Sequence, residues 1–476
     1  MPASVIHTSP YGGTWYPKEP AELAGLMEKL WRESAARTGP HLLDGGLAYV
    51  VPHAGLVYSG TVAAAVYRYL ERQRPKCILL AGFAHSGAAA GIGIPDIDGF
   101  RTPLGDVAID RDLADRFAAE EPFRRMPEPE LCDHSVEIQL PLLQRAAPGA
   151  RVVPLYVGHL QTPDRQRAAR RLASCLSPGT VLLASSDLTH FGSAFHYQPF
   201  PADSGAADRL RRLDFEILEA AGSLREAFFL QTLREKSSTV CGAEPIALLL
   251  ATVGLLEQDA EVFQDVLDYQ TSGETTGDFH HSVSYGALGY FPCTSFQFDE
   301  EEQHAILELA RRTLAEYRKT GQRMVPQLPP SGLPALARRS ALFVTLHKDG
   351  QLRGCIGRST SDEPLEDAVP KLTMAAALED RRFDSVLPSE TGIEVEISIL
   401  SPLKRIVQRS DFRAGEHGAV LVAKGHQGLL LPQVATERGW NADQFFHALA
   451  TKTGVSADVY SNPSTRISVF RAQIIH

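Results

Sequence analysis

The chain has 476 residues, of which 47 are Lys or Arg and 57 are Asp or Glu, so its formal net charge at pH 7 is -10. This length exceeds what one hydrophobic core usually supports, which predicts two domains. The acidic balance argues against a general nucleic-acid-binding protein, because such proteins need a basic surface to displace counterions from phosphates.

The N-terminal sequence MPASVIHTSPYGG lacks the positively charged start and the apolar core of a secretory signal. No uninterrupted apolar stretch reaches the length of a membrane span. We therefore expect a cytoplasmic protein without a membrane partner. The six cysteines are scattered and form no CxxC pair, which indicates neither a disulfide framework nor a zinc ribbon.

Short apolar segments alternate with helical segments through the first part of the chain. Continuous apolar runs that alternate with helices are typical of an α/β fold with a mostly parallel sheet flanked by helices. Such sheets bind ligands at the carboxyl ends of their strands. The expected strands lie in GLAYVVPHAG (46–55), KCILLAGFAHSG (76–87), RVVPLYVG (151–158) and TVLLASSDLTHFG (180–192), and the clearest helices in TVAAAVYRYLERQ (61–73) and PDRQRAARRLASCL (163–176).

The pattern changes near residue 293, where a closing strand passes through an acidic segment into a long amphipathic helix, FPCTSFQFDEEEQHAILELARRTLAEYRKTG (291–321). Beyond it, strands and helices no longer alternate one for one, which favours a smaller α+β domain. We therefore expect domains at 1–295 and 296–476.

Three of the apolar runs of the first domain are followed by a histidine: His53, His85 and His190, the last preceded by Asp187. If these strands are neighbours and parallel, the side chains meet in one crevice. Cys241, in SSTVCGAEPIALLL, lies at the expected start of a helix, where the helix dipole would lower the pKa of a thiol and favour its use as a ligand or nucleophile.

Each of these residues also has a structural alternative. A histidine after a strand can be an ordinary turn residue, Asp187 can cap a turn or helix, and Cys241 can be a small buried side chain at a helix start. The segment DHSVEIQLPLL (133–143) places His134 and Glu137 on one helical face beside Asp133. There we favour a supporting or structural role over direct binding.

The order and spacing of six motifs resemble the Memo family over roughly residues 6–293. That family is similar in fold to the class III extradiol dioxygenases, which open catechol-type rings with non-haem iron. The resemblance implies a metal pocket with His53, His85 and Cys241 as ligands, and with Asp187 and His190 beside open coordination positions. The motifs are GTWYP (13–17), PHAGLVYSG (52–60), AHSG (84–87), DHSVEIQLPLL (133–143), SSDLTHFG (185–192) and CGAEPIALLL (241–250).

The remainder, about 297–476, resembles the AMMECR family, with LRGCIG (352–357) as its most distinctive motif. Both families are similar to components of a three-part prokaryotic set called AmmeMemoRadiSam, which includes a radical-SAM protein. The resemblance therefore implies such a protein as a partner. Within QLRGCIGR, Arg353 could lower the pKa of the Cys355 thiol in a functional cleft, and the alternative is a tight turn with a small buried cysteine.

Two imidazoles and one anionic ligand leave room on a metal for substrate and dioxygen, as in non-haem Fe(II) oxygenases. The dioxygenase pattern has a carboxylate where this chain offers Cys241, and a thiolate is a softer ligand. We expect Fe(II), with Cu or Zn as alternatives. His190 is the candidate general base, because an imidazole can accept a proton near neutral pH, and Asp187 would orient His190 or a metal-bound water.

The leading hypothesis is a metal-dependent oxidoreductase of the dioxygenase-like kind, acting on an unknown small-molecule or modified substrate. The alternative is a metal-binding or scaffold protein without turnover, whose crevice recognises a peptide or a protein partner. Both hypotheses use the same ligands, so the residues alone do not separate them.

Overall fold

The computed structural model describes residues 4–85, 90–127, 132–257, 260–323, 325, 332–360 and 363–476. The chain divides into two compact units, Met1–Ser295 and Phe296–His476. Of the AHSG motif, Ser86 and Gly87 lie outside the described residues. Within the ranges that are described, no helix combines the length and the apolar character needed to cross a membrane.

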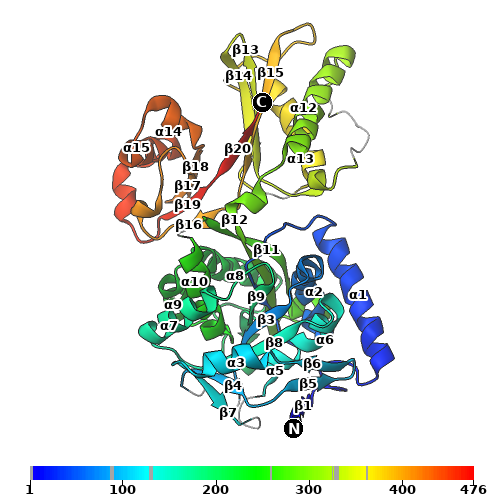
Figure 1. The fold of residues 1–476 in the computed structure, drawn as a ribbon. Coiled ribbons are helices and arrows are strands. Elements are labelled where there is room, and N and C mark those ends of the chain that lie inside the picture. The colour runs from blue at the N-terminus through cyan, green and yellow to red at the C-terminus, as the bar shows by residue number, and fades with distance from the viewer. Residues whose placement is uncertain are drawn as a thin grey trace. The chain divides into compact units, whose positions relative to one another are not determined.

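The first unit is built on a sheet whose nine described strands run in the order β10-β12-β2-β9-β3-β8-β4-β7, with β11 paired to β12 (Figure 1). The four central strands are parallel: β2 (Ala48–Val51), β9 (Thr180–Ser185), β3 (Cys77–Gly82) and β8 (Arg151–Val157). The expected α/β fold with a parallel sheet is therefore confirmed at the centre.

Some strands at the margins of this sheet pair antiparallel. The alternation of apolar and helical segments in the sequence does not reveal these pairs. β12 pairs antiparallel with β2, β10 and β11, and β4 pairs antiparallel with β8 but parallel with β7. The strands at the margins are β10 (His190–Gly192), β11 (Val262–Thr271), β12 (His281–Pro292), β4 (Ile92–Pro95) and β7 (Phe123–Met126).

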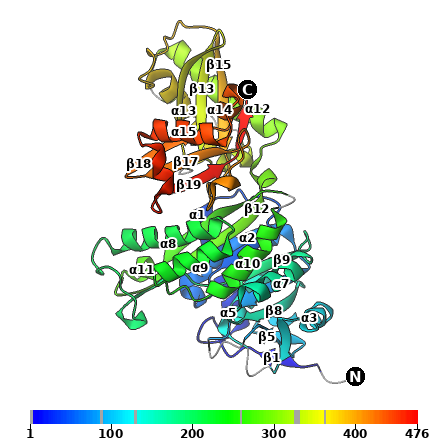
Figure 2. The same ribbon diagram turned by 90° about the vertical axis from the view of Figure 1, so that its left-hand side faces the viewer.

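Helices cover both faces of the sheet (Figures 1 and 2). Because both faces are covered, every residue of β2 and β3 is buried, which explains their unbroken apolar sequences. One face carries α1 (Pro20–Thr38), α2 (Leu56–Gln73) and α6 (Gln139–Ala146), and the other carries α7 (Thr162–Ala173), α8 (Ala206–Gly222), α9 (Glu226–Glu235) and α10 (Ala243–Leu256).

Shorter elements complete the first unit around this layered core. A separate small sheet pairs β5 with both β1 and β6. These elements are β1 (Ile6–Thr8), β5 (Gly99–Thr102), β6 (Gly105–Ala108), α3 (Arg111–Ala118), α5 (His134–Glu137) and α11 (Ser272–Thr276).

The second unit contains two antiparallel sheets, each packed against helices, as expected for an α+β domain. Residues of α12 and α13 share one buried cluster with the first sheet, and residues of α15 share another with the second sheet. The first set comprises α12 (Glu300–Thr320), β13 (Leu342–Lys348), β14 (Gln351–Arg358), α13 (Leu365–Leu378), β15 (Ile393–Leu400) and β20 (Ala472–Ile475). The second comprises β16 (Lys404–Arg405), β17 (Gly418–Ala423), β18 (His426–Leu430), α14 (Gln433–Arg438), α15 (Ala442–Thr453) and β19 (Arg466–Phe470).

Candidate metal centre

His53, His85 and Asp187 follow the carboxyl ends of β2, β3 and β9, three neighbouring parallel strands. The ring centroids of His53 and His85 are 5.4 Å apart. The backbone N–H of His53 donates a hydrogen bond to Asp187 Oδ1 over 2.8 Å. The structure thus brings these three residues together at one edge of the sheet.

The buried ring of His53 is held at one nitrogen by a chain of hydrogen bonds. Its Nδ1 lies 3.1 Å from Ser185 Oγ, which accepts a bond of 3.0 Å from Gln139 Nε2. The Gln139 carbonyl oxygen accepts in turn from the Tyr67 hydroxyl. These contacts leave Nε2 facing Cys241 Sγ at 3.1 Å. Burial, together with the charge of His85, lowers the pKa of His53 to about 3, so the ring is neutral at pH 7.

Cys241 lies just before α10, where Gly242 is the N-cap residue. Its Sγ accepts a bond of 3.2 Å from the backbone N–H of Asp187, and the N–H of Gly242 donates to Ser186 Oγ. Burial, with the Asp187 charge as the next cause, raises the pKa of the Cys241 thiol. The expectation that the helix start would lower this pKa is therefore wrong, because loss of solvation outweighs the helix dipole.

Asp187 lies in the turn between β9 and β10, and His190 is the first residue of β10. Burial raises the pKa of Asp187 to about 6, although the charge of His190 acts in the opposite direction. His190 Nδ1 lies 3.1 Å from the carbonyl oxygens of Leu188 and Thr239, so Nδ1 carries the proton and donates it. Backbone carbonyls therefore orient this ring, which leaves orientation of a metal-bound water as the other role expected for Asp187, and Nε2 of His190 is left as the basic nitrogen.

The carboxylate of Asp133 lies beside the rings of both His85 and His134. Asp133 Oδ1 lies 2.9 Å from His85 Nδ1 and 3.5 Å from His134 Nδ1. Burial opposes ionisation of Asp133, but hydrogen bonds from His85 and from the N–H of Ser135 lower its pKa to about 2. Burial and the neighbouring histidines lower the pKa of His134 to about 4, so this ring is also neutral at pH 7.

Among the described residues, two groups of side chains at this edge could hold a metal ion, and His53 belongs to both. One consists of His53, His85 and His134, and the other of His53, Asp187 and Cys241, with the donor atoms of each group within 4.8 Å of one another. The expected ligands, His53, His85 and Cys241, are therefore divided between the two groups. His53 belongs to both, His85 to the first and Cys241 to the second. Neutral imidazoles, a thiol and a carboxylate are a donor set that suits Fe(II), Cu or Zn.

His134 was not among the expected ligands, because it follows no strand. It begins α5, for which Asp133 is the N-cap residue and accepts a bond from Ser135 N. The Asp-His pair at a helix start is the sequence signal that points to it. Glu137, expected on the same face, is fully buried and instead lies 3.2 Å from His7 Nε2 through Oε1, which fits the structural role we favoured.

In the second unit, QLRGCIGR forms the strand β14 and not a tight turn. The turn lies before it, where Asp349 and Gly350 have positive φ angles. Gly354 is required by packing, because an added Cβ would lie 2.2 Å from the carbonyl oxygen of Ala376 in α13. Gly354 thus permits close contact between the strand and α13.

Cys355 is partly exposed on β14. Arg353, which we expected to act on this thiol, is paired with Glu390, its Nε lying 2.9 Å from Oε1. Two other cations interact with Cys355: Arg382 donates a hydrogen bond to its carbonyl oxygen, and Lys452, whose pKa burial lowers, interacts with it electrostatically. The thiol therefore has cationic neighbours other than the one expected.

Comparison with known proteins matches residues 8–289 to the family described as Memo-like protein and residues 307–475 to the family described as AMMECR1. A MEMO1 family protein of Aeropyrum pernix is 33% identical over 299 residues, which cover 60% of this chain and 99% of that protein. A protein of Methanothermobacter thermautotrophicus is 36% identical over 183 residues, 37% of this chain and 94% of its own length.

A solved structure of an uncharacterized protein from Pyrococcus horikoshii is 32% identical, covering 37% of this chain and 92% of its own, with a TM-score of 0.35. The Memo-like match spans more than half of the chain and contains every residue of both candidate metal-binding groups. The chain therefore belongs to the Memo-like protein family and carries an AMMECR1 domain after its Memo-like domain.

Proposed function

We propose that the first unit binds a metal ion through His53, His85 and Cys241 and uses it to oxidise a small-molecule substrate with dioxygen as the oxidant. The observation that carries this proposal is the buried, neutral His53 ring, whose Nε2 lies 3.1 Å from the Cys241 thiol. Fe(II) is the favoured ion, with Cu and Zn as alternatives, since a thiolate beside imidazoles suits all three. When bound, such an ion supplies Lewis-acid and redox chemistry.

His190 is the proposed general base. Because its Nδ1 donates to the carbonyl oxygens of Leu188 and Thr239, its Nε2 has a free lone pair for a substrate proton. The Asp187 carboxylate, whose pKa is about 6, is mostly ionised at pH 7 and would stabilise the imidazolium that forms. Asp187 also fixes the backbone of His53 through its 2.8 Å hydrogen bond.

The metal-binding part is tested by measuring the metal content of anaerobically purified protein. We expect one ion per chain in the wild type and at least about a 10-fold loss of affinity in His53→Gln, His85→Gln and Cys241→Ser. His304→Gln, an exposed position on α12, is the matched control. Equal metal loading of the ligand variants and the control would refute this centre.

The oxidoreductase part is tested by oxygen uptake with a panel of catechols and related phenols. We expect substrate-dependent uptake by the iron-loaded protein and a loss of about 100-fold or more in His190→Gln. Stoichiometric metal binding without any uptake would instead favour the alternative, a binding or scaffold protein that recognises a peptide.

A radical-SAM protein is the proposed partner, on the ground of the resemblance to the AmmeMemoRadiSam set. Its product, a modified small molecule or peptide, would then be the substrate of the metal centre. Co-purification of the two proteins from one expression host tests this link, and their complete separation under mild conditions would count against it.

A further inference from the structure

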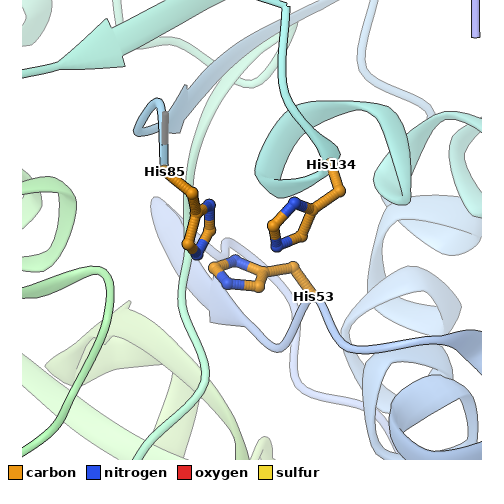
Figure 3. A group of neighbouring side chains, drawn as sticks. All are labelled: His53, His85 and His134. Atoms are coloured by element: carbon orange, nitrogen blue, oxygen red, sulfur yellow. The ribbon is translucent and has the colours of Figure 1, made fainter. Parts of the chain in front are cut away.

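The rings of His53, His85 and His134 gather at one place, although they come from two strand ends and one helix start (Figure 3). We propose that these three imidazoles form a second metal position, which adjoins the thiol-containing position through the shared His53 and His85. This inference rests on the proposed function and deepens it, because it adds His134 as a ligand and specifies the class of cation.

Asp133 supports this role because it faces the Nδ1 atoms of both His85 and His134, with a hydrogen bond to the first and a longer contact to the second. Its Oδ1 lies 2.9 Å from His85 Nδ1 and 3.5 Å from His134 Nδ1. Metal-binding histidines usually direct the nitrogen that does not bind the ion toward a carboxylate or a carbonyl oxygen. With both Nδ1 atoms on the side of Asp133, both Nε2 atoms are left for an ion.

Ring packing fixes the orientation of His134 from both sides. The ring stacks on His85 with centroids 4.0 Å apart and 25° between planes, and it lies 4.4 Å from the Trp15 ring. Its plane is nearly perpendicular to that of His53, at 86°. A ring with no function beyond packing would make the same stacking contacts, so a test must preserve the stacking and remove only the nitrogen atoms.

The two positions differ in the cations that they prefer. Three imidazoles with an open fourth position suit borderline divalent ions such as Zn²⁺ or Co²⁺, whereas a thiolate shifts preference toward softer ions such as Cu(I). His53 Nδ1 is engaged by Ser185, so its Nε2 serves both positions. Only one position is therefore filled at a time, and the ion that is bound decides which.

Cobalt titration tests this inference, because a Co²⁺–thiolate bond gives a charge-transfer band that an all-imidazole site lacks. We expect Cys241→Ser to bind one Co²⁺ without that band. Adding His134→Phe, which keeps a ring between His85 and Trp15 but has no donor, should weaken Co²⁺ binding at least about 10-fold. As the control, adding His304→Gln to Cys241→Ser should leave the Co²⁺ affinity unchanged.

The outcomes separate this inference from the proposed function. If the wild type binds Co²⁺ with the thiolate band but Cys241→Ser binds none, the three-imidazole position is refuted and the thiol-containing one stands. The inference is also refuted if Cys241→Ser with His134→Phe binds as tightly as Cys241→Ser alone. Failure of the wild type to bind any metal would refute both, and circular dichroism of each variant checks that it is folded.

Discussion

The hydroxyl of Ser185 controls the orientation of His53, and its removal has a calculable cost. Ser185 is fully buried, and its Oγ contacts His53 Nδ1 at 3.1 Å and Gln139 Nε2 at 3.0 Å. Ser185→Ala removes both contacts without adding bulk. Gln139 retains its 2.9 Å bond to the carbonyl oxygen of Pro52, so His53 Nδ1 is the group left without this partner.

A buried polar group that loses its partner costs about 1–3 kcal/mol of folding free energy. Loss of an orienting partner also weakens metal binding by a ligand histidine about 10–100-fold, which is about 1.4–2.8 kcal/mol of binding free energy. We therefore expect Ser185→Ala to lower both the melting temperature and the affinity for Zn²⁺.

Zinc titration and thermal unfolding of the same preparations measure both effects. Ser223→Ala is the matched control, because Ser223 is also buried and its Oγ donates to the carbonyl oxygen of Ala220, away from any candidate ligand. If Ser185→Ala loses stability like the control yet binds Zn²⁺ as tightly as the wild type, the reasoning about His53 orientation is wrong.

Three further predictions concern a proton, a packing contact and a thiol. The metal affinity of the position that contains Cys241 should rise about tenfold per pH unit from about pH 6 to about pH 8. Burial raises the pKa of Cys241, and its proton must leave when the ion binds. Metal titrations that give the same affinity at each pH would contradict this. Gly354→Ala should lower the free energy of unfolding by about 1–3 kcal/mol, because its Cβ would meet the carbonyl oxygen of Ala376, and an unchanged melting temperature would show that α13 can shift. Iodoacetamide should modify partly exposed Cys355 faster than Cys77, which is 6% exposed and whose pKa burial raises to about 12, and mass spectrometry that finds equal rates would refute the accessibility argument.

The central sheet and the gathering of His53, His85 and Asp187 could be predicted because both follow from local sequence. Continuous apolar runs indicate strands covered on both faces, and parallel neighbours place their carboxyl ends at one edge. Each of these residues lies two or three positions beyond such a run, which is too short a distance for the side chain to leave that edge.

His134 could not be predicted as part of the cluster by the same argument. It follows no strand, and its position depends on how the start of α5 packs beside the end of β3. That contact joins residues distant in the sequence, and hydrophobic periodicity does not report it. The Asp-His pair was visible, but its nearness to His85 was not.

The chemistry of the cysteines also could not be predicted from the local sequence. The position of Cys241 at a helix start was correct, but the sign of its pKa shift depends on burial by the turn around Asp187, which comes from elsewhere in the chain. In the second unit, Gly354 suggested a turn, whereas it serves to admit α13. A glycine in a sequence can indicate limited space around the backbone or an unusual φ angle, and the sequence alone does not distinguish the two.

The hydrogen-bonded chain from His53 through Ser185 and Gln139 ends at Tyr67, deep in α2. The tilt of the imidazole is therefore coupled to how α2 and α6 pack in the apolar interior. Substitutions in that interior, far from any donor atom, would change how strongly an ion is held, so related proteins could acquire different metal preferences while keeping every ligand the same.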